Sequence, residues 1–157
     1  MIVGSAASCE FHFALPCTIE SSESSRRIAW DCLYNKARSP MGYVPAIINC
    51  KIVAEYENNE FRRVIERNGV RIVQDVRLYG ATWRIEFHHI DDEDTSYIYN
   101  QLRITASGDI LYVMGVVNTA RWLNNARLNP KMFVDQCAYF EAALNAAGRR
   151  LAADMER

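Results

Sequence analysis

Hydrophobic and polar residues alternate in the first patterned segment of the chain. Over residues 9–15, every second position is apolar: Cys9, Phe11, Phe13 and Leu15. A period of two predicts a half-buried strand, which Pro16 ends. Apolar residues then recur at helical offsets over residues 23–38, at Trp30, Leu33, Tyr34 and Ala37. This spacing predicts an amphipathic helix that stops at Ser39-Pro40.

Six further strands are predicted between residues 49 and 118. The runs cover residues 49–56, 60–68, 70–79, 82–90, 96–106 and 110–118. Short turns rich in Gly, Asn and Asp separate them, and such links join antiparallel neighbours into a meander. Residues 41–48, around Pro45, predict a helical turn or a tight connector.

The last patterned segment, residues 130–155, predicts a long helix. Asn129 can cap it, Pro130 suits its first position, and apolar residues follow at steps of three and four. They are Phe133, Cys137, Phe140, Leu144, Ala147 and Leu151. The pattern therefore predicts an α+β fold in which a seven-stranded antiparallel sheet curves around this helix.

A curved sheet of this size has more apolar inner surface than one helix can fill. The helix also carries a run of small residues: Ala142, Ala143, Ala146, Ala147 and Gly148. Small side chains leave space where Leu or Phe would fill it. We therefore expect an internal pocket larger than about 300 Å³.

Composition narrows the class of protein. The chain has 157 residues, enough for one domain over residues 1–157, and half of them are hydrophobic. A net charge of −1 makes nucleic acid a poor candidate partner. No run of about 18 apolar residues predicts a membrane span. Residues 1–8 lack the pattern of a targeting signal.

Cysteine and histidine positions bear on location and cofactors. The five cysteines are scattered with no CxxC pair, which is typical of reduced thiols in a cytoplasmic protein. His88 and His89 are adjacent on one predicted strand and point to opposite faces, so we expect no metal site. No glycine-rich phosphate loop is present, and we expect no cofactor.

Four polar residues lie on otherwise apolar strand faces. By alternation, Gln74, Asn100, Tyr112 and Arg63 all point inward with hydrophobic neighbours. A buried polar group needs a partner, which is either a structural hydrogen bond or a ligand. We take Arg63, Tyr112, Gln74 and Asn100 as candidate catalytic residues that stabilise an enolate or polarise a carbonyl.

Of these four residues, a buried Arg63 has the greatest need for a hydrogen-bonding or charged partner. Its fork of donors suits a carboxylate, phenolate or enolate oxygen of a ligand. The structural alternative is an ion pair with Asp75, which lies on the next predicted strand across the Asn68-Gly69 turn.

Apolar and aromatic side chains supply the candidate ligand-binding wall. Trp83, Ile85, Phe87 and His89 share one face of a predicted strand, and Tyr43 and Phe140 lie on neighbouring elements. We take these six as ligand-binding candidates, although core packing and a satisfied histidine are the ordinary roles of such residues.

The topology and several local strings resemble a known superfamily. The strings are residues 33–40 and 43–50, then Arg63-Val64, the hairpin at residues 79–87, Asn100, and residues 108–111. They are similar to the START-like, helix-grip superfamily, also called SRPBCC, and within it to the AtaL-like branch of fungi and bacteria. The resemblance covers nearly the whole chain, and its most specific part is the stretch from Lys36 to Ile47.

This resemblance implies the helix-grip fold and an internal cavity for a ligand. Relatives of this kind serve as cyclases, aromatases and dehydratases of natural-product pathways, or carry hydrophobic small molecules. Our first hypothesis is a cofactor-free enzyme that acts on a hydrophobic, polyketide-like intermediate. The alternatives are a non-catalytic carrier or sensor of a hydrophobic metabolite, and an interaction module. In each case we expect a monomer or homodimer.

Overall fold

The computed structural model describes residues 8–17 and 21–157. The prediction that residues 1–8 carry no targeting signal falls mainly on residues 1–7, which lie outside the described residues. The strands are β1 (Ser8–Leu15), β2 (Ile47–Glu55), β3 (Phe61–Arg67), β4 (Val70–Tyr79), β5 (Arg84–Ile90), β6 (Thr95–Ile104) and β7 (Ile110–Asn118). The helices are α2 (Ser22–Arg38), α3 (Ala120–Leu128) and α4 (Lys131–Met155), with 3-10 turns η1 (Glu57–Asn59) and η2 (Gly80–Thr82).

The seven strands form one antiparallel sheet in the order β1-β7-β6-β5-β4-β3-β2. The predicted meander and helix-grip architecture are confirmed.

The turn between β3 and β4 illustrates why these residue types form the links between strands. Asn68 and Gly69 both have positive φ, 52° and 77°. Two left-handed residues match the right-handed twist of a hairpin, and Asn and Gly tolerate this conformation best.

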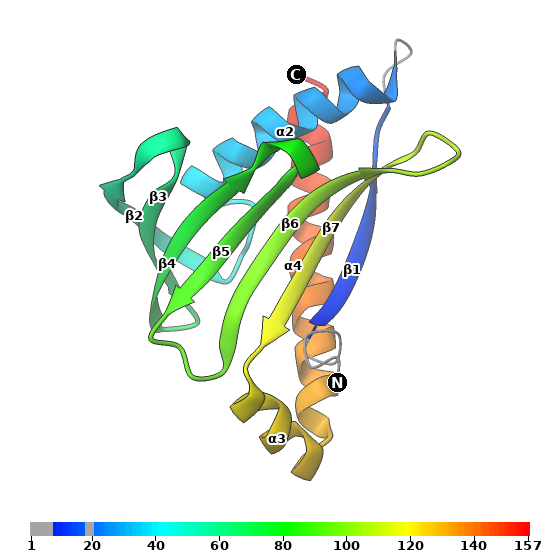
Figure 1. Ribbon diagram of the computed structural model, residues 1–157. Coiled ribbons are helices and arrows are strands. Elements are labelled where there is room, and N and C mark those ends of the chain that lie inside the picture. Colours follow the sequence, from blue (N-terminus) through cyan, green and yellow to red (C-terminus); the bar gives the residue numbers. More distant parts are fainter. Residues whose placement is uncertain (1–7, 18–20) are drawn as a thin grey trace.

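Both long helices lie on the same face of the sheet (Figure 1). The α4 helix runs along the sheet, and α2 crosses one end of it, where the carboxyl-terminal half of α4 also lies. Every second residue of a strand points toward these helices, and such residues, for example Phe61, Ile65 and Val76, are almost completely buried. At its amino terminus, α2 is capped by Ser21, whose hydroxyl accepts from the Ser24 amide.

The small residues of α4 do not hold open a large void. A Cβ placed on Gly148 would lie 2.5 Å from the ring of Phe13 on β1. This glycine therefore lets the aromatic ring of the edge strand sit directly on the helix backbone. The space is filled by the sheet's own side chains.

Two local features differ from the sequence predictions. The helix α3 was not predicted, although Thr119 caps it by accepting from the Trp122 amide. The strand predicted from residue 82 begins at Arg84, because Gly80–Thr82 forms the turn η2 and Trp83 takes a left-handed conformation with φ 54°. Trp83 consequently belongs to this turn and not to the strand that carries Phe87, and it still packs against the core as a partly buried residue.

Substituting Gly148 tests the close approach of β1 to α4. We expect Gly148→Val to lower the free energy of unfolding by about 1–3 kcal/mol, because the added atoms overlap the ring of Phe13. The matched control is Ala153→Val on the exposed side of the same helix, with an expected change within about 0.5 kcal/mol. Urea unfolding of both variants measures the difference, and equal stability of the two would contradict this packing.

Candidate functional site

Polar side chains from four elements meet between α2 and the inner face of the sheet. Arg63 comes from β3, Gln74 from β4 and Asn100 from β6, as alternation predicted. Lys36 joins them from α2 and was not among the predicted site residues. All four are buried, with exposed fractions of 5% or less.

These four residues line an internal cavity of about 40 Å³. The rest of its wall is Val44, Ile47, Ile65, Arg67, Phe87, Ile98, Met114, Tyr139, Phe140 and Ala143. The prediction of a pocket larger than about 300 Å³ is wrong for this interior space. Aromatic rings, methionine and the long stems of the basic residues occupy the volume between sheet and helix, leaving room for one or two waters or a carbonyl group.

A second pocket adjoins the cavity from outside. It has a volume of about 160 Å³ and is lined by Val44, Pro45, Ala46, Tyr139, Ala142 and Ala143. Val44, Tyr139 and Ala143 belong to both pockets. The Tyr139 hydroxyl is buried at this boundary and has no hydrogen-bond partner among the described residues. The two pockets thus share one wall, with an apolar lining on the outer side and the buried polar side chains on the inner side.

Lys36 reaches the cavity because it lies on the buried face of α2 with Ala29 and Leu33. Its Nζ donates to Asn100 Oδ1 at 2.9 Å and lies near the rings of Phe87 and Tyr112. Burial disfavours the charged form and lowers the pKa of Lys36 to about 7, with a further contribution from the positive charge of Arg63. Lys36 is therefore partly neutral at neutral pH.

Arg63 uses two of its donors to join separate elements. Nε donates to Gln74 Oε1 at 2.8 Å, and Nη1 donates to the Ala37 carbonyl at 2.6 Å, near the end of α2. The guanidinium also lies 4.5 Å from the centre of the Phe87 ring. Burial lowers the pKa of Arg63 to about 10, so the group stays charged at neutral pH.

The predicted alternative of an ion pair between Arg63 and Asp75 is wrong. Asp75 pairs with Arg62, at 2.8 and 2.9 Å, on the opposite face of the sheet. The register sets Arg62 opposite Asp75 and Arg63 opposite Gln74. Because successive strand residues point to opposite faces, a carboxylate at position 75 cannot reach the cavity.

A chain of hydrogen bonds fixes the orientation of Gln74. Its oxygen accepts from Arg63, so its amide nitrogen donates to His89 Nε2, which is 2.9 Å away. An unprotonated Nε2 leaves the proton on Nδ1, which lies 2.8 Å from Asp92 Oδ2. Burial lowers the pKa of His89, in keeping with this neutral form. His89 therefore supports Gln74 from behind without lining the cavity.

The buried cations lack an acidic partner. Among the described residues, no carboxylate lies within 4.0 Å of Lys36 or Arg63. Arg63 Nη2 and Asn100 Nδ2 also donate to no group in the described parts of the chain. The cavity thus combines positive charge with unused donors, which suits a ligand oxygen that carries negative charge.

The remaining predicted site residues separate into two groups. Phe87 and Phe140 line the cavity. Ile85 and Tyr112 are fully buried beside it, and the Tyr112 hydroxyl donates to Asn100 Oδ1 at 3.4 Å. Tyr112 therefore contacts the site through Asn100.

Tyr43 and Trp83 lie outside the cavity wall. The Tyr43 hydroxyl donates to Asp154 at the end of α4. Trp83 packs edge-on against Trp30, with ring centres 5.9 Å apart, beneath the guanidinium of Arg26. Both aromatic residues attach α2 or its following loop to the rest of the fold.

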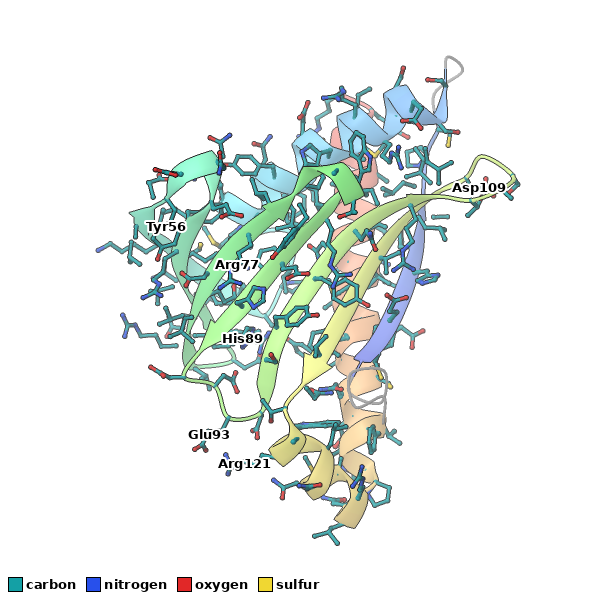
Figure 2. All side chains as sticks on the ribbon, in the orientation of Figure 1. Tyr56, Arg77, His89, Glu93, Asp109 and Arg121 are labelled. Carbon is teal, nitrogen blue, oxygen red and sulfur yellow. The ribbon has the colours of Figure 1, made fainter. Side chains whose placement is uncertain are left out.

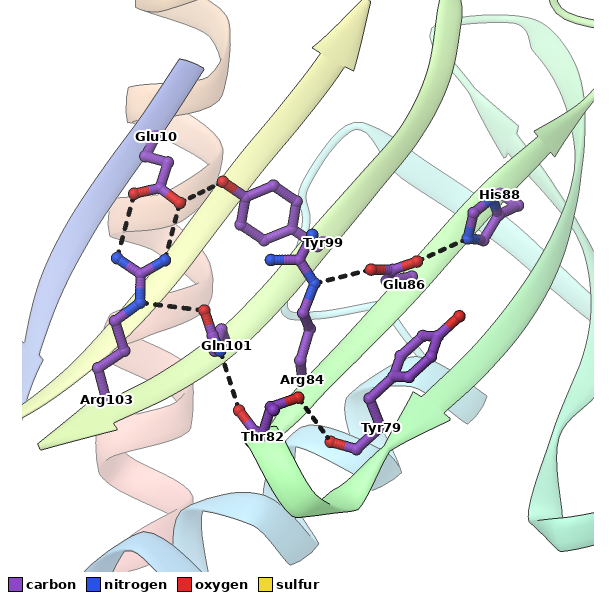
Figure 3. A network of polar contacts seen from close by, with 9 residues as sticks. All are labelled: Glu10, Tyr79, Thr82, Arg84, Glu86, His88, Tyr99, Gln101 and Arg103. Carbon is purple, nitrogen blue, oxygen red and sulfur yellow. Dashed lines mark hydrogen bonds and ion pairs between the residues drawn. The ribbon is translucent and has the colours of Figure 1, made fainter. Parts of the chain in front are cut away.

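The outer face of the sheet carries a separate polar network (Figure 3). Glu86 accepts from Arg84 at 2.7 Å and pairs with His88 at 2.8 Å, so His88 faces away from His89 as predicted. Arg103 binds Glu10 across β6, β7 and β1. In Figure 2, Glu93 and Arg121, which form an ion pair, lie at the far end of the sheet near α3.

Sequence comparison identifies the family. The family described as "Acetylaranotin biosynthesis cluster protein L", AtaL, matches residues 19–115, more than half of the chain. The chain belongs to the AtaL family. The matched region contains Lys36, Arg63, Gln74 and Asn100. No curated protein sequence matches the chain.

Solved structures share the fold at low sequence identity. Zhui aromatase/cyclase from Streptomyces sp. R1128 is 14% identical with a TM-score of 0.61, over 96% of this chain and 93% of that one. A START superfamily protein from Mycobacterium smegmatis is 16% identical with a TM-score of 0.56, over 92% and 98%. Ara h 8.0201 is 12% identical with a TM-score of 0.62, over 93% and 97%. These likenesses confirm the START-like fold of this AtaL family member.

The described residues contain neither a membrane-spanning helix nor a metal-binding cluster. No helix in the described ranges is long and apolar enough to cross a membrane. Within the same ranges, no three His, Cys, Asp or Glu side chains gather in a way that would hold a metal ion. All five cysteines are free thiols.

The buried amine makes stability depend on pH in a defined direction. Between about pH 7 and the ordinary lysine pKa of about 10.4, the unfolded chain binds more protons at Lys36 than the folded chain. The stability penalty of Lys36 is therefore complete below pH 7 and declines as the pH rises. We expect Lys36→Met to raise the free energy of unfolding by about 1–4 kcal/mol at pH 6, and by less at pH 10.

Urea unfolding at both pH values measures this effect. Lys51→Met is the matched control, because Lys51 is exposed on β2 and its replacement removes no buried amine. A Lys36→Met protein less stable than the parent at pH 6 would show that Lys36 is a structural cation.

Proposed function

We propose that this AtaL family protein is a cofactor-free enzyme that stabilises an enolate of a hydrophobic, polyketide-like intermediate and so promotes its cyclisation or dehydration. One observation carries the proposal: two buried basic side chains, the charged Arg63 and the partly protonated Lys36, line one small cavity without an acidic partner. A buried charge without a counter-ion destabilises the fold, so a ligand that supplies the counter-charge is the favoured explanation.

The chemistry follows from the free donors. A substrate with alternating carbonyl groups becomes an enolate when the carbon between two of them gives up a proton to water. Arg63 Nη2 and Asn100 Nδ2 can donate to the enolate oxygen, and Lys36 adds positive charge beside Asn100. Fixed donors in a dry site stabilise such a charge more strongly than water does, because they need no reorganisation.

The two pockets suit different parts of the proposed substrate. The outer apolar pocket of about 160 Å³ suits the hydrocarbon part, while the inner cavity of about 40 Å³ suits a carbonyl group. A polar cluster that converges on one point favours an enzyme over a simple carrier, for which an apolar cavity suffices. We propose that the enzyme works as a monomer or homodimer in the cytoplasm, in keeping with its five free thiols.

The comparisons support the same class of reaction. The family takes its description from an acetylaranotin biosynthesis cluster, and a structural neighbour is named an aromatase/cyclase. Both names concern the assembly of natural products.

Arg63 and its neighbour Arg62 offer a matched pair of variants. The substrate is a synthetic poly-β-keto thioester, and its cyclisation is followed by liquid chromatography with mass detection. We expect Arg63→Met to lower the enzymatic rate roughly 30- to 150-fold, equivalent to about 2–3 kcal/mol for a lost charged hydrogen bond. Arg63→Lys recovers part of the rate, because an ammonium lacks the fork.

Arg62→Met is the control, since Arg62 pairs with Asp75 on the outer face and its loss leaves the rate within about twofold. Thermal melting of all three variants separates a folding defect from a loss of chemistry. A fully active Arg63→Met protein would retire the enolate role. A parent protein that retains the thioester unchanged in native mass spectrometry would identify a carrier.

A further inference from the structure

Lys36 has the surroundings of a reactive amine. The residue is 5% exposed and lines the cavity, and its Nζ donates to the neutral amide oxygen of Asn100, another lining residue. The charged and titratable groups that face this space from the packed elements are Arg63 and Arg67 on β3, Tyr112 on β7 and Tyr139 on α4. Because none of them is a carboxylate, this set supplies no negative charge of that kind to hold Lys36 in its protonated form.

We propose that Lys36 Nζ condenses with a ligand carbonyl to form a covalent iminium. The nitrogen lone pair bonds to the carbonyl carbon, the carbon–oxygen π pair moves to oxygen, and proton transfer gives a carbinolamine. Addition of one proton and departure of the oxygen as water then leave a positively charged carbon–nitrogen double bond. One water reverses the sequence and releases the carbonyl compound. The proposal rests on the proposed function in one respect, that the cavity admits a carbonyl group.

The neighbours of Lys36 suit both the addition of the amine to the carbonyl and the persistence of the iminium. Arg63 Nη2 and Asn100 Nδ2 can donate to the carbonyl oxygen while it gains negative charge. The positive charge of Arg63 favours the neutral amine, which is the nucleophilic form. The apolar wall, with Phe87, Met114 and Phe140, limits the water that would hydrolyse the iminium.

An iminium would also serve bond formation between carbons. The positive nitrogen acidifies the neighbouring C–H bond more strongly than a hydrogen-bonded carbonyl does. Transfer of that proton to the water released in the condensation gives a neutral enamine. The enamine carbon attacks a second carbonyl of the same substrate molecule, the new alkoxide takes up a proton, and the iminium re-formed at Lys36 is hydrolysed by one water. The covalent link therefore adds a substrate class to the proposed function: ketones or aldehydes with an enolisable neighbour.

The chain offers a clean chemical test, because Lys36, Lys51 and Lys131 are its only lysines. The probe is acetylacetone, a small β-diketone that traps neutral amines as a stable enaminone with near-ultraviolet absorption. At pH 7.5 we expect Lys36 to be labelled about 100-fold faster than exposed Lys51 and Lys131, because burial lowers the pKa of Lys36 to about 7. Intact mass and peptide mapping of the parent protein locate the label.

Two variants show whether the cavity causes the reactivity. Lys36→Met abolishes the fast phase. Asn100→Asp sets a carboxylate where the amide oxygen now lies, 2.9 Å from Nζ, and raises the pKa of the amine. We therefore expect its labelling to slow at least about tenfold at pH 7.5 and its pH midpoint to move upward. Circular dichroism verifies that each variant is folded.

The outcomes separate this inference from the proposed function. Labelling of the parent protein that is equal at all three lysines, or absent from Lys36, overturns the iminium. If Arg63-dependent cyclisation of the thioester persists in that case, the enolate enzyme stands without a covalent step. If Lys36 is labelled rapidly but no cyclisation occurs, the reactive amine is supported and the proposed reaction is rejected.

Discussion

Arg63 ties three parts of the molecule together through one planar group. It donates to the Ala37 carbonyl near the end of α2 and to Gln74 on β4, and it lies over Phe87 on β5. A rigid fork meets all these partners in one orientation only. The helix end is consequently held against the sheet at a fixed place, and the cavity lies there. The partial negative charge at the carboxyl end of a helix offsets only part of the buried positive charge.

Strand periodicity accounts for the part of the site that the sequence predicts. Arg63, Gln74, Asn100 and Tyr112 were recognised because a strand alternates strictly, so a polar residue with apolar neighbours two positions away has to point inward. The same reasoning predicted the opposed directions of His88 and His89, whereas the antiparallel sheet was predicted from the short turns between strands. What it could not supply was the partner of each side chain. Pairing depends on register, and a shift of one residue moves a side chain to the other face.

The features that were missed depend on side-chain packing and on helix context. Lys36 lies in the last turn of α2, where a lysine is ordinarily solvated and interacts with the helix dipole. The one sequence signal for its burial is that it follows Leu33 and Ala29 at helical offsets. The small cavity reflects how the rings of Phe87 and Phe140 fill the interior, which no pattern of residue types specifies. Membership of the family accounts for the fold, whereas the positive charge in the cavity comes from the individual residues Lys36 and Arg63.

The pairing of β1 with β7 sets an order of events during synthesis. Phe11 on β1 lies opposite Met114 on β7, so β1 leaves the ribosome well before the strand with which it pairs. The hairpins from β2 to β7 are joined by short links and can form earlier, since local contacts form faster than distant ones. Until then β1 remains an unpaired strand with exposed aromatic side chains, the kind of segment that associates with other chains. Because the ring of Phe13 packs against Gly148, β1 can complete its packing only after α4 has been synthesised.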